Sequence, residues 1–592
     1  MALLYPTLAH IQKSRYKPET GETRLLTFLE NNLSDEYEVY FQPFLNGDRP
    51  DVVLMRRGSG VLIIEVKDWH LPSYFIDENN NWRIATNSAR TKSPLAQVKA
   101  YKDNLYDLHI DHLLSRKIKN EKFYAIVSCA VYFHCASENE VLQFCGGADH
   151  IELLGNDSLT ASKFSSLLSR HWLNKQSLYF DDGLYESFKR YLQPPLHAML
   201  HGIEIGYKDK QRELIESRPV EQKIRGVAGS GKTKVLAKRA VNAHLRTNER
   251  ILILTFNITL RNYIHDKISE VKEDFSWDSF YITHYHLFFA IEANNHDLET
   301  SNLLNDCYNE MFFEPVKDKI QKYSAIFVDE VQDQETAWIR IVKKYFLKAG
   351  GEFVVFGDEK QNVYQLTMAE DKKPNTTIVG RWNELNDSRR ASSRIIHLAF
   401  EFQDRFFGNK YELDEINIVE QPDLFSQPQY ISQLSFDKNV QVTEVYNQLD
   451  NILKTLSIHP NDICIVSPRV ELLRELDFLI RTQSHERTAV TFETKEEYAA
   501  LSGNDQDVET LRRSRKFHFW MNTGTIKLAT IHSFKGWEVH TLILVIDDNI
   551  ITDELIYTAI TRCRQNLVVI NLDNKKYASF FGQYTDTLPN KN

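Results

Sequence analysis

The sequence is poor in cysteine, and its cysteines are scattered. None of the six lies in a C-x-x-C pair, and they occupy positions 129, 135, 145, 307, 464 and 563. This spacing favours free thiols over disulfides. An iron–sulfur cluster lacks its four nearby cysteines. Zinc held by Cys129, His134, Cys135 and Cys145 is the metal alternative that the cysteines leave open.

Long apolar runs are also missing. No stretch approaches the roughly 18 residues that a membrane-spanning helix needs, and the start, Met1 to Pro6, lacks the basic segment that opens a signal peptide. We therefore expect a cytoplasmic protein with no membrane partner. Internal repeats and low-complexity tracts are absent too. A chain of 592 residues should then fold into three or four unlike globular domains.

There is no excess of positive charge, since the formal net charge is -10. This total does not exclude a nucleic-acid enzyme, because salt screens charges beyond about 8 Å and local patches matter more. Thr86 to Lys102 carries basic residues and no acid, and Leu511 to Trp520 interleaves basic with aromatic residues. Both stretches fit the path of a phosphate backbone. For the second, a solvated loop followed by a core strand is the alternative.

The run from Gly226 to Thr233 has the spacing G-x-x-x-x-G-K-[ST] of a phosphate-binding loop. Gly229 and Gly231 allow backbone N–H groups to wrap the phosphates, Lys232 reaches the β and γ phosphates, and Thr233 holds Mg²⁺. A strand ending at Arg225 and a helix from Lys234 give the loop the expected context. The run predicts ATP binding.

A second motif follows about a hundred residues later. The apolar strand Ala325 to Val328 ends in Asp329 and Glu330, where Asp329 can complete the Mg²⁺ shell and Glu330 can orient and deprotonate the attacking water. An ordinary strand end with solvated acids is the alternative. Gln332 and Asp333 extend this pair to D-E-x-Q-D, which is not general among phosphate-loop enzymes.

With these motifs the chain resembles the UvrD/Rep-type superfamily 1 helicases, from about Tyr207 to Asn571. The resemblance implies that Gln361 senses the γ-phosphate. It assigns single-strand contacts to Phe256, His284 and Tyr364, the last of which stacks on a base. Gln211 stands where the family has an adenine-reading glutamine, with a surface glutamine as the alternative.

The resemblance continues in the C-terminal part of the chain. Thr530 to Glu538 is similar to T-x-H-x-x-K-G-x-E, in which Glu538 would read the ribose while His532 and Ser533 hold the nucleic-acid backbone. Arg562, in Tyr557 to Arg562, would be the arginine finger, and such a finger raises phosphoryl-transfer rates by about 10³- to 10⁵-fold. Arg390 aligns with a second ATP-contacting arginine, although Ser388 and Arg389 replace the usual Asn and Tyr.

A different chemistry is indicated near the N-terminus. Two apolar runs joined by Gly58-Ser-Gly60 predict a β-hairpin. If the turn centres on Gly58, Asp51 and Glu65 pair across the strands, and Lys67 points to the same face as Glu65. Two carboxylates and an ammonium can bind Mg²⁺, with Mn²⁺ as an alternative ion, and activate a water against a phosphodiester. The hairpin therefore predicts a metal-dependent nuclease site.

This segment resembles the PD-(D/E)xK nucleases, specifically the nuclease-related NERD domain. The resemblance makes Glu22, on a first helix at Leu25 to Leu33, a further metal ligand. Gln97 and Tyr101, one helical turn apart, would contact substrate or orient the metal site. The alternative is a degenerate nuclease fold that only binds.

The expected fold class is α/β. A restriction-endonuclease-like α/β/α domain should precede two RecA-like parallel-sheet lobes with a reduced helical insertion. The expected bounds are residues 1–154 for the nuclease domain, 155–202 for a helical connector, 203–380 for lobe 1 and 381–592 for lobe 2, the last interrupted by an insertion at about 410–522. The interval from Asn257 to Asp329 is short for the helicase family, which puts processive unwinding in question.

These inferences combine into one function, an ATP-dependent DNA helicase or translocase of superfamily 1A fused to a Mg²⁺-dependent DNA nuclease. Its partner would be DNA with a single-stranded segment, and a homo-oligomer is compatible with the sequence. The resemblance favours a bacterial role in defence against phage or in DNA repair. An ATP-gated nucleic-acid sensor that does not unwind, and a nuclease-helicase acting on RNA, are the alternatives.

Overall fold

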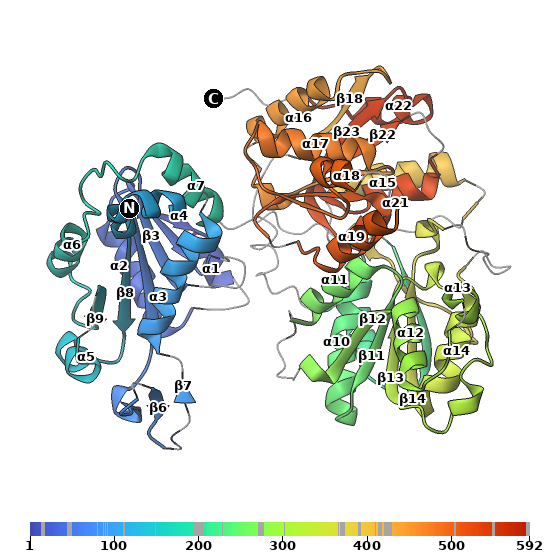
Figure 1. Cartoon of the computed structure of the whole chain (residues 1–592), viewed down its shortest axis with the longest axis horizontal. Helices are drawn as coiled ribbons and strands as arrows, with labels where there is room; N and C mark the ends of the chain where they lie inside the picture. Colours follow the sequence, from blue (N-terminus) through green and yellow to red (C-terminus); the bar gives the residue numbers. More distant parts are fainter. Residues whose placement is uncertain are drawn as a thin grey trace. The chain divides into compact units, whose positions relative to one another are not determined.

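The structure is a computed structural model. It describes the chain except for residues 14–17, 44–49, 80, 87, 89, 92, 111–112, 148–149, 193–206, 208, 228, 270, 272–276, 301, 365, 367–372, 389–391, 409, 412–416, 419–428, 457, 502–504, 522, 548–550 and 588–592. Two compact units form, Met1–Ile205 with Asn522–Gly524 and Gly206–Met521 with Thr525–Asn592 (Figure 1). Within the described residues, no helix has the length and apolar character to cross a membrane.

The first unit is built on a six-stranded sheet with the order β1-β2-β3-β4-β8-β9. β2, β3 and β4 are antiparallel neighbours, and β1, β8 and β9 join in parallel. The strands are β1 Leu3–Tyr5, β2 Tyr37–Phe41, β3 Val52–Arg56, β4 Gly60–Lys67, β8 Val127–Phe133 and β9 Ile151–Gly155, with β5 Tyr74–Ile76, β6 Trp82–Ile84 and β7 Arg90–Thr91 in a smaller sheet. The helices are α1 Leu8–Lys13, α2 Thr20–Asn32, α3 Pro94–Asn104, α4 Leu113–Lys119, α5 Glu138–Cys145, α6 Ala161–Arg170 and α7 Asp182–Leu192.

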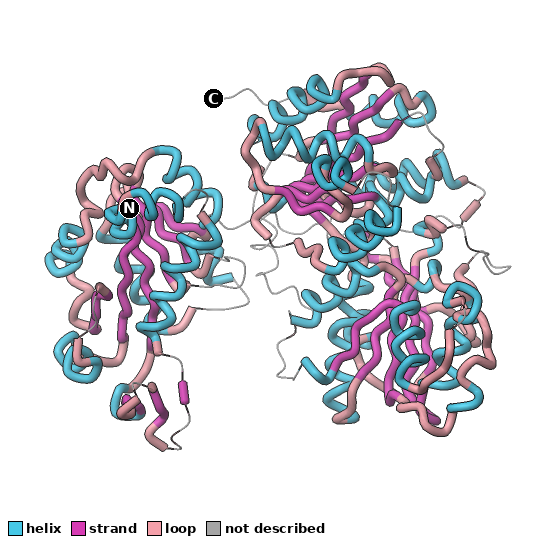
Figure 2. The backbone as a smooth tube through the Cα atoms, in the orientation of Figure 1, coloured by secondary structure: helices cyan, strands magenta, loops and turns pink. Residues whose placement is uncertain are grey.

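Helices cover both faces of this sheet (Figure 2). Because successive residues of a strand face opposite sides, alternate residues of β3 and β4 enter two separate cores. One core joins the sheet to α2 and α6 and includes Leu25, Leu29, Val52, Leu54, Leu62, Ile64 and Phe164. The other joins it to α3 and α7 and includes Val53, Met55, Val61, Ile63, Val98 and Phe188. The expected α/β/α layering is confirmed.

Two expected boundaries in this unit are corrected. The helix expected at Leu25 to Leu33 begins at Thr20 and is preceded by α1. The described part of the expected connector, residues 155–192, belongs to the domain, since α6 buries Phe164 and α7 buries Phe188 in the cores of the sheet. These apolar side chains are shielded from water because they pack against the sheet. The first unit therefore continues past Leu154 to Ile205.

The second unit contains two six-stranded sheets, and all strand pairs in both are parallel. The sheet of lobe 1 has the order β12-β11-β13-β14-β10-β15. Its strands are β10 Glu221–Gly226, β11 Ile251–Thr255, β12 Phe280–His284, β13 Tyr323–Val328, β14 Leu347–Gly357 and β15 Asn383–Leu385. Its helices are α9 Asp209–Leu214, α10 Lys232–Thr247, α11 Ile258–Ser269, α12 Tyr285–Asn295, α13 Leu303–Asp306 and α14 Thr336–Phe346, with the 3₁₀ turns η6 Val331–Asp333 and η7 Glu359–Gln361.

The sheet of lobe 2 has the order β18-β23-β22-β19-β21-β20. Its strands are β18 Ile431–Phe436, β19 Ile463–Ser467, β20 Thr488–Val490, β21 Ile526–Thr530, β22 Val539–Asp547 and β23 Cys563–Leu572. β16 Asp387–Ser388 and β17 Asn417–Ile418 form a separate two-stranded sheet. The helices are α15 Ser393–Phe407, α16 Val442–Leu456, α17 Glu471–Thr482, α18 Lys495–Ala500, α19 Asp505–Phe517, α20 Ile531–Phe534, α21 Asp553–Ile560 and α22 Lys575–Phe581.

The expected bounds of the two lobes are also corrected. β15 pairs with β10, so the sheet of lobe 1 runs beyond residue 380 to Leu385. The range 410–522 is no insertion, because it supplies β18, β19 and β20 to the central sheet of lobe 2. These strands belong to the sheet because their apolar side chains are buried under helices. Ile465 of β19 and Ile543 of β22, for example, lie in one core with residues of α16 and α17. The expected pair of parallel-sheet lobes is confirmed.

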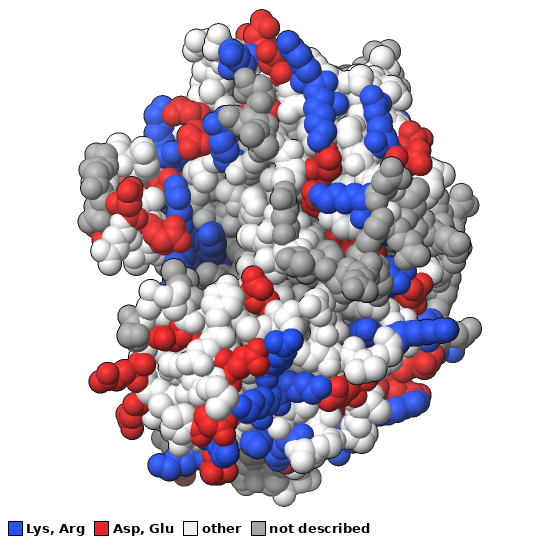
Figure 3. Space-filling view, turned by 90° about the vertical axis from the view of Figure 1, so that its right-hand side faces the viewer, with Lys and Arg blue, Asp and Glu red and all other residues white. Residues whose placement is uncertain are grey.

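Charges of both signs are mixed on the surface. On the face in Figure 3, basic and acidic side chains are interspersed, in keeping with 71 Lys and Arg against 81 Asp and Glu in the chain. The net charge therefore does not identify a binding face, and individual contacts decide where one lies.

Candidate active sites

The predicted nuclease residues meet at one end of the sheet of the first unit. The register of β3 and β4 pairs Val52 with Ile64, so Asp51 and Glu65 are next to each other at the end of the hairpin. Lys67 Nζ donates a hydrogen bond to Glu65 Oε1 at 2.5 Å. Two carboxylates and an ammonium thus lie on one face, as the turn geometry predicts.

Burial makes this cluster electrostatically unusual. Removal from water, and then the negative charge of Glu65, raise the pKa of Asp51 to about 7. The pKa of Glu65 is also raised by burial. Asp51 Oδ2 accepts a hydrogen bond from the Val66 amide at 2.7 Å, whereas Glu65 Oε2 is buried without a hydrogen-bond partner.

Glu22 joins the cluster from the first turn of α2. Its carboxylate accepts hydrogen bonds from the Glu19 amide at 2.7 Å and from Gln42 Nε2 at 2.9 Å. The Gly21 amide donates to both carboxylate oxygens of Asp68 at 3.0 Å. A Cβ on Gly21 would lie 2.0 Å from Asp68 Oδ1, so only glycine lets α2 approach the end of β4.

Gln42 and Asp68 are positioning residues that sequence reasoning missed. Asp68 directly follows Lys67, and that adjacency was the available signal. Gln42 has a φ of 44°, a left-handed conformation that costs a residue with a Cβ about 1–3 kcal/mol and is retained where surrounding structure requires it. Nothing in the sequence foretold this conformation.

A cation fits the buried end of this cluster. Oε2 of Glu65 is buried without a hydrogen-bond partner and the pKa of Asp51 is raised, so a nearby positive charge would stabilise both carboxylates. Across the described residues, however, no group of three His, Cys, Asp or Glu side chains has the geometry of a metal site. Gln97 Nε2 donates to the Tyr101 hydroxyl at 2.7 Å on α3, which packs against β4 and β8.

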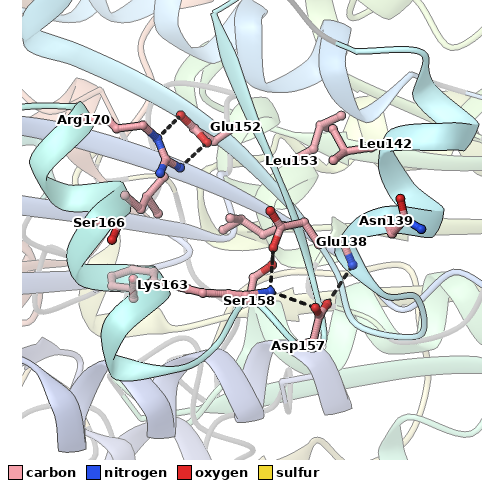
Figure 4. Close-up of a pocket in the computed structure, with 13 residues that line it drawn as sticks. Glu138, Asn139, Leu142, Glu152, Leu153, Asp157, Ser158, Lys163, Ser166 and Arg170 are labelled. Carbon is pink, nitrogen blue, oxygen red and sulfur yellow. Dashed lines mark hydrogen bonds and ion pairs between the residues drawn. The ribbon is translucent and has the colours of Figure 1, made fainter.

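A separate cavity of about 350 Å³ lies between β9, α5 and α6 (Figure 4). Its charged side chains satisfy one another. Lys163 pairs with Glu138 and Asp157 at 2.9 and 2.8 Å, and Arg170 pairs with Glu152 at 2.8 Å. These cations are neutralised, so the cavity offers little attraction to a phosphate.

Two glycines of the phosphate-binding loop of lobe 1 have a left-handed backbone conformation. Gly229 and Gly231 have φ values of 76° and 87°, which side chains with a Cβ rarely adopt. Lys232 and Thr233 begin α10, and Lys232 Nζ donates to the Gly226 carbonyl at 2.6 Å. Gln211, on α9, is buried and donates to the Ser230 carbonyl at 2.9 Å, which places it against the loop.

The two acids that follow β13 are buried beside this loop. Burial and the charge of Glu330 raise the pKa of Asp329 to about 7. Burial would also raise the pKa of Glu330, but the charges of Lys535, Arg562 and Lys232 outweigh it and hold this pKa below its usual value. Asp329 Oδ2 is buried without a hydrogen-bond partner. Glu330 therefore stays ionised, and Asp329 presents an oxygen suited to a cation.

Lobe 2 contributes two cations to the same site. Arg562 donates a hydrogen bond to the side-chain oxygen of Gln361. Lys535 Nζ bonds Asp333 and lies 3.6 Å from Glu330. Both cationic side chains are buried, so lobe 2 closes onto the acids of lobe 1.

Three of the predicted nucleic-acid residues, Phe256, Tyr364 and His532, form a row of rings. The ring of Tyr364 lies 4.6 Å from Phe256 and 5.6 Å from His532, and 41% of Tyr364 is exposed. His284 is buried, and Ser533 Oγ accepts a hydrogen bond from Thr530. The row draws residues from both lobes and suits the stacking of bases.

Asn257 and Thr259 hold the two lobes together beside this row. Asn257 Nδ2 donates to the carbonyl of His532 at 2.5 Å, and Thr259 Oγ1 donates to that of Ser533 at 2.6 Å. With Lys535, they are further residues whose roles sequence reasoning did not assign, although Lys535 lies within the motif from Thr530 to Glu538 and Asn257 directly follows Phe256.

Glu538 and Arg390 are two further residues that were predicted to contact ATP. Glu538 is half-buried and lies between α20 and β22. Arg390 lies outside the residues that the structure describes.

Two family models match separate parts of the chain. Residues 17–134 match the family model of the nuclease-related domain, and residues 211–367 match that of an AAA domain. Among curated proteins, none matches the chain. A solved complex of Arterivirus nonstructural protein 10, a helicase, with DNA is 12% identical with a TM-score of 0.27, over 63% of this chain and 65% of that one, slightly less than two thirds of its length. The chain thus joins an N-terminal nuclease-related domain to an AAA domain.

Proposed function

We propose that the protein is an ATP-dependent DNA helicase or translocase with an attached metal-dependent DNA nuclease. The observation that carries the motor proposal is the meeting of Arg562 and Lys535 with Gln361 and the acids of lobe 1. Because both lobes contribute side chains to this one site, hydrolysis or release of the nucleotide changes the contacts between the lobes. ATP turnover can then drive lobe movement.

The nucleotide chemistry follows from the buried charges. Lys232 neutralises the phosphates, and Thr233 and Asp329 are the residues that would hold Mg²⁺, whose charge offsets that of the phosphates. Glu330 is ionised and accepts the proton of the attacking water. Arg562 stabilises the charge that develops during phosphoryl transfer.

The ring row fits DNA with a single-stranded segment. Stacking on Phe256 and Tyr364 contributes about 1–3 kcal/mol per base and tolerates any sequence, as a translocating enzyme requires. The carbonyls of His532 and Ser533 are fixed by lobe 1, so strand contacts and lobe closure use one structural element.

The nuclease proposal rests on the buried cluster of the first unit. Asp51 and Glu65, with Glu22, would hold Mg²⁺ or Mn²⁺, which would supply an activated water and neutralise the phosphodiester. Lys67 donates a hydrogen bond to the Glu65 carboxylate and would offset charge on the scissile phosphate. Gln97 and Tyr101 would contact the strand.

We assign the combined activity to defence against foreign DNA or to DNA repair. Both processes need a strand to be opened and cut, and the chain carries a candidate site for each step.

Incubation of the purified protein with end-labelled DNA, with and without ATP and Mg²⁺, tests the proposal. We expect DNA-stimulated ATP hydrolysis, strand displacement that needs ATP, and cleavage that needs the metal. ATP turnover without displacement would favour the nucleic-acid sensor, and stronger stimulation by RNA than by DNA would identify RNA as the substrate.

A further inference from the structure

The basic residues of α19 divide into two groups with different partners. Arg512 forms hydrogen bonds with both oxygens of Glu493, at 2.6 and 2.9 Å. Arg515 pairs with Glu497 at 2.5 Å. These two guanidinium groups are neutralised within lobe 2, so their ion pairs explain why α19 carries positive charge at these two positions.

The second group has no such explanation. Within the described part of the chain, Arg513 and Lys516 of α19 and Arg261 of α11 form no ion pair, although the chain has 81 acidic residues. The guanidinium carbons of Arg261 and Arg513 lie 5.3 and 6.0 Å from the ring centroid of Phe517. The ring of Phe517 thus lies close to two positively charged side chains, one from each lobe.

Contacts with lobe 1 fix the position of the cluster formed by Arg261, Arg513, Lys516 and Phe517. Asn262 Nδ2, on α11, donates to the carbonyls of Phe517 and Phe519, both at 2.9 Å. A loose surface loop would lack such anchors. The geometry therefore holds the cations near one another, where their mutual repulsion favours the approach of an anion.

The cluster also adjoins predicted strand contacts of both lobes. The ring of Phe517 lies 6.3 Å from that of His284 in lobe 1. Burial, and then the charges of His286, Arg513 and Arg261, lower the pKa of His284 to about 4. Burial lowers the pKa of His532 in lobe 2, to which the charges of Lys535 and Lys516 contribute. The unneutralised cations are thus close to a nucleic-acid motif on each side.

We propose that Arg261, Arg513 and Lys516 bind successive phosphates of a single-stranded nucleic acid, and that Phe517 packs against a base or sugar of the same strand. The inference rests on the proposed motor function and extends its binding site to α19, outside the helicase motifs. Since Arg261 belongs to lobe 1 and Arg513 to lobe 2, a strand bound here bridges the lobes. The shared ligand chemistry is a phosphodiester backbone, supplied by DNA or RNA.

The test measures binding of fluorescein-labelled oligo(dT) and oligo(U) to the full-length chain by anisotropy, in EDTA so that no metal-dependent cleavage occurs. For single strands, the slope of log K against log salt falls in magnitude by about 0.7 for each phosphate that the protein no longer neutralises. We expect a decrease of that size for Arg513→Gln and for Arg261→Gln, and about twice that for the double variant. Phe517→Leu should weaken binding at least about fivefold without changing the slope.

Matched controls separate an effect at the phosphates from a general effect of charge or folding. Lys454→Gln removes one positive charge from α16, where Lys454 is exposed and paired with Asp450, and should leave affinity and slope unchanged. Arg512→Gln breaks a structural pair and should lower the thermal midpoint more than Arg513→Gln does. Equal slopes for wild type, Arg261→Gln and Arg513→Gln would overturn the site.

The outcome also separates this inference from the function on which it rests. If the wild type binds neither oligomer and its ATPase responds to neither, the motor proposal itself fails. If the wild type binds and is stimulated while the slopes of the arginine variants stay unchanged, only the α19 site fails. Tighter binding of oligo(U) than of oligo(dT), with the same decrease in slope, supports the site and identifies RNA as its ligand.

Discussion

Arg562 of lobe 2 donates a hydrogen bond to the side-chain oxygen of Gln361 in lobe 1. Gln361 in turn donates to Asp358 at 2.9 Å, and Asp358 lies 3.5 Å from Lys232 Nζ. A continuous chain of polar contacts therefore connects the arginine of one lobe to the phosphate-binding lysine of the other. An anionic phosphate near Lys232 would compete with Asp358 and change every contact in the chain.

Arg562→Ala should retain ATP binding and lose turnover by about 10³-fold or more, because a finger acts on charge that develops in the transition state. Steady-state ATPase rates and equilibrium binding of a labelled nucleotide check this. Gln361→Ala should impair turnover less, since it leaves the guanidinium in place. Normal turnover in Arg562→Ala would show that another group stabilises the transition state.

Lys232→Ala and Glu330→Gln should both abolish ATP hydrolysis but differ in binding. Loss of Lys232 removes the cation that holds the phosphates, whereas Glu330→Gln keeps that cation and removes only the proton acceptor. Filter binding of labelled ATP should therefore show retention in Glu330→Gln alone. Hydrolysis at the wild-type rate by Glu330→Gln would contradict the assignment of the base.

Asp51→Ala, Glu65→Ala and Lys67→Ala should each eliminate cleavage in Mg²⁺ or Mn²⁺ and leave DNA-stimulated ATPase intact, since these residues lie in a unit with its own cores. Gel assays of labelled DNA, with ATPase as the control in the same samples, measure both. We also expect wild-type cleavage to respond to ATP and Lys232→Ala to lose that response. Undiminished cleavage by all three variants would mean that the nuclease site lies elsewhere.

Phe188→Ala should destabilise the first unit by about 3–5 kcal/mol, because it removes a fully buried ring from the core between α7 and the sheet. Denaturant unfolding of a fragment ending at Ile205 measures the change. A fragment ending at Leu154 lacks α6 and α7 and should not fold cooperatively. Cooperative unfolding of that shorter fragment would restore the boundary that the sequence suggested.

Lys527, on β21, should make the stability of lobe 2 depend on pH. Burial lowers its pKa from 10.5 to about 7, and Asp462 opposes this only in part. Between these values the unfolded chain binds a proton that the folded chain does not, so the free energy of unfolding should rise as pH increases from about 7 toward 10.5.

Comparison with Lys527→Met tests this expectation. The difference in unfolding free energy between wild type and variant should shift in favour of the wild type across that window. Urea titrations at several pH values measure it. Parallel pH profiles for the two proteins would show that Lys527 keeps an ordinary pKa in the folded state.

Local chemistry was readable from the sequence. The phosphate-binding loop needs Gly229 and Gly231 because their φ values are positive, and spacing alone reveals such a loop. The hairpin register that joins Asp51 to Glu65 followed from the position of Gly58, since pairing across a turn is a matter of counting. Motif order likewise indicated the two lobes, and the hairpin with its resemblance to the nuclease-related domain indicated the N-terminal nuclease.

Contacts between distant segments were decided by the tertiary structure. The sequence did not show that α6 and α7 belong to the first unit, or that residues 431–490 supply three strands to lobe 2, because an amphipathic segment does not specify the surface that buries it. It did not show that Gln42 holds Glu22, that Lys535 reaches Asp333, or that Arg261 and Arg513 share the ring of Phe517. Spacing fixes which groups lie on one strand or turn, whereas packing between elements far apart in the chain fixes which charges meet.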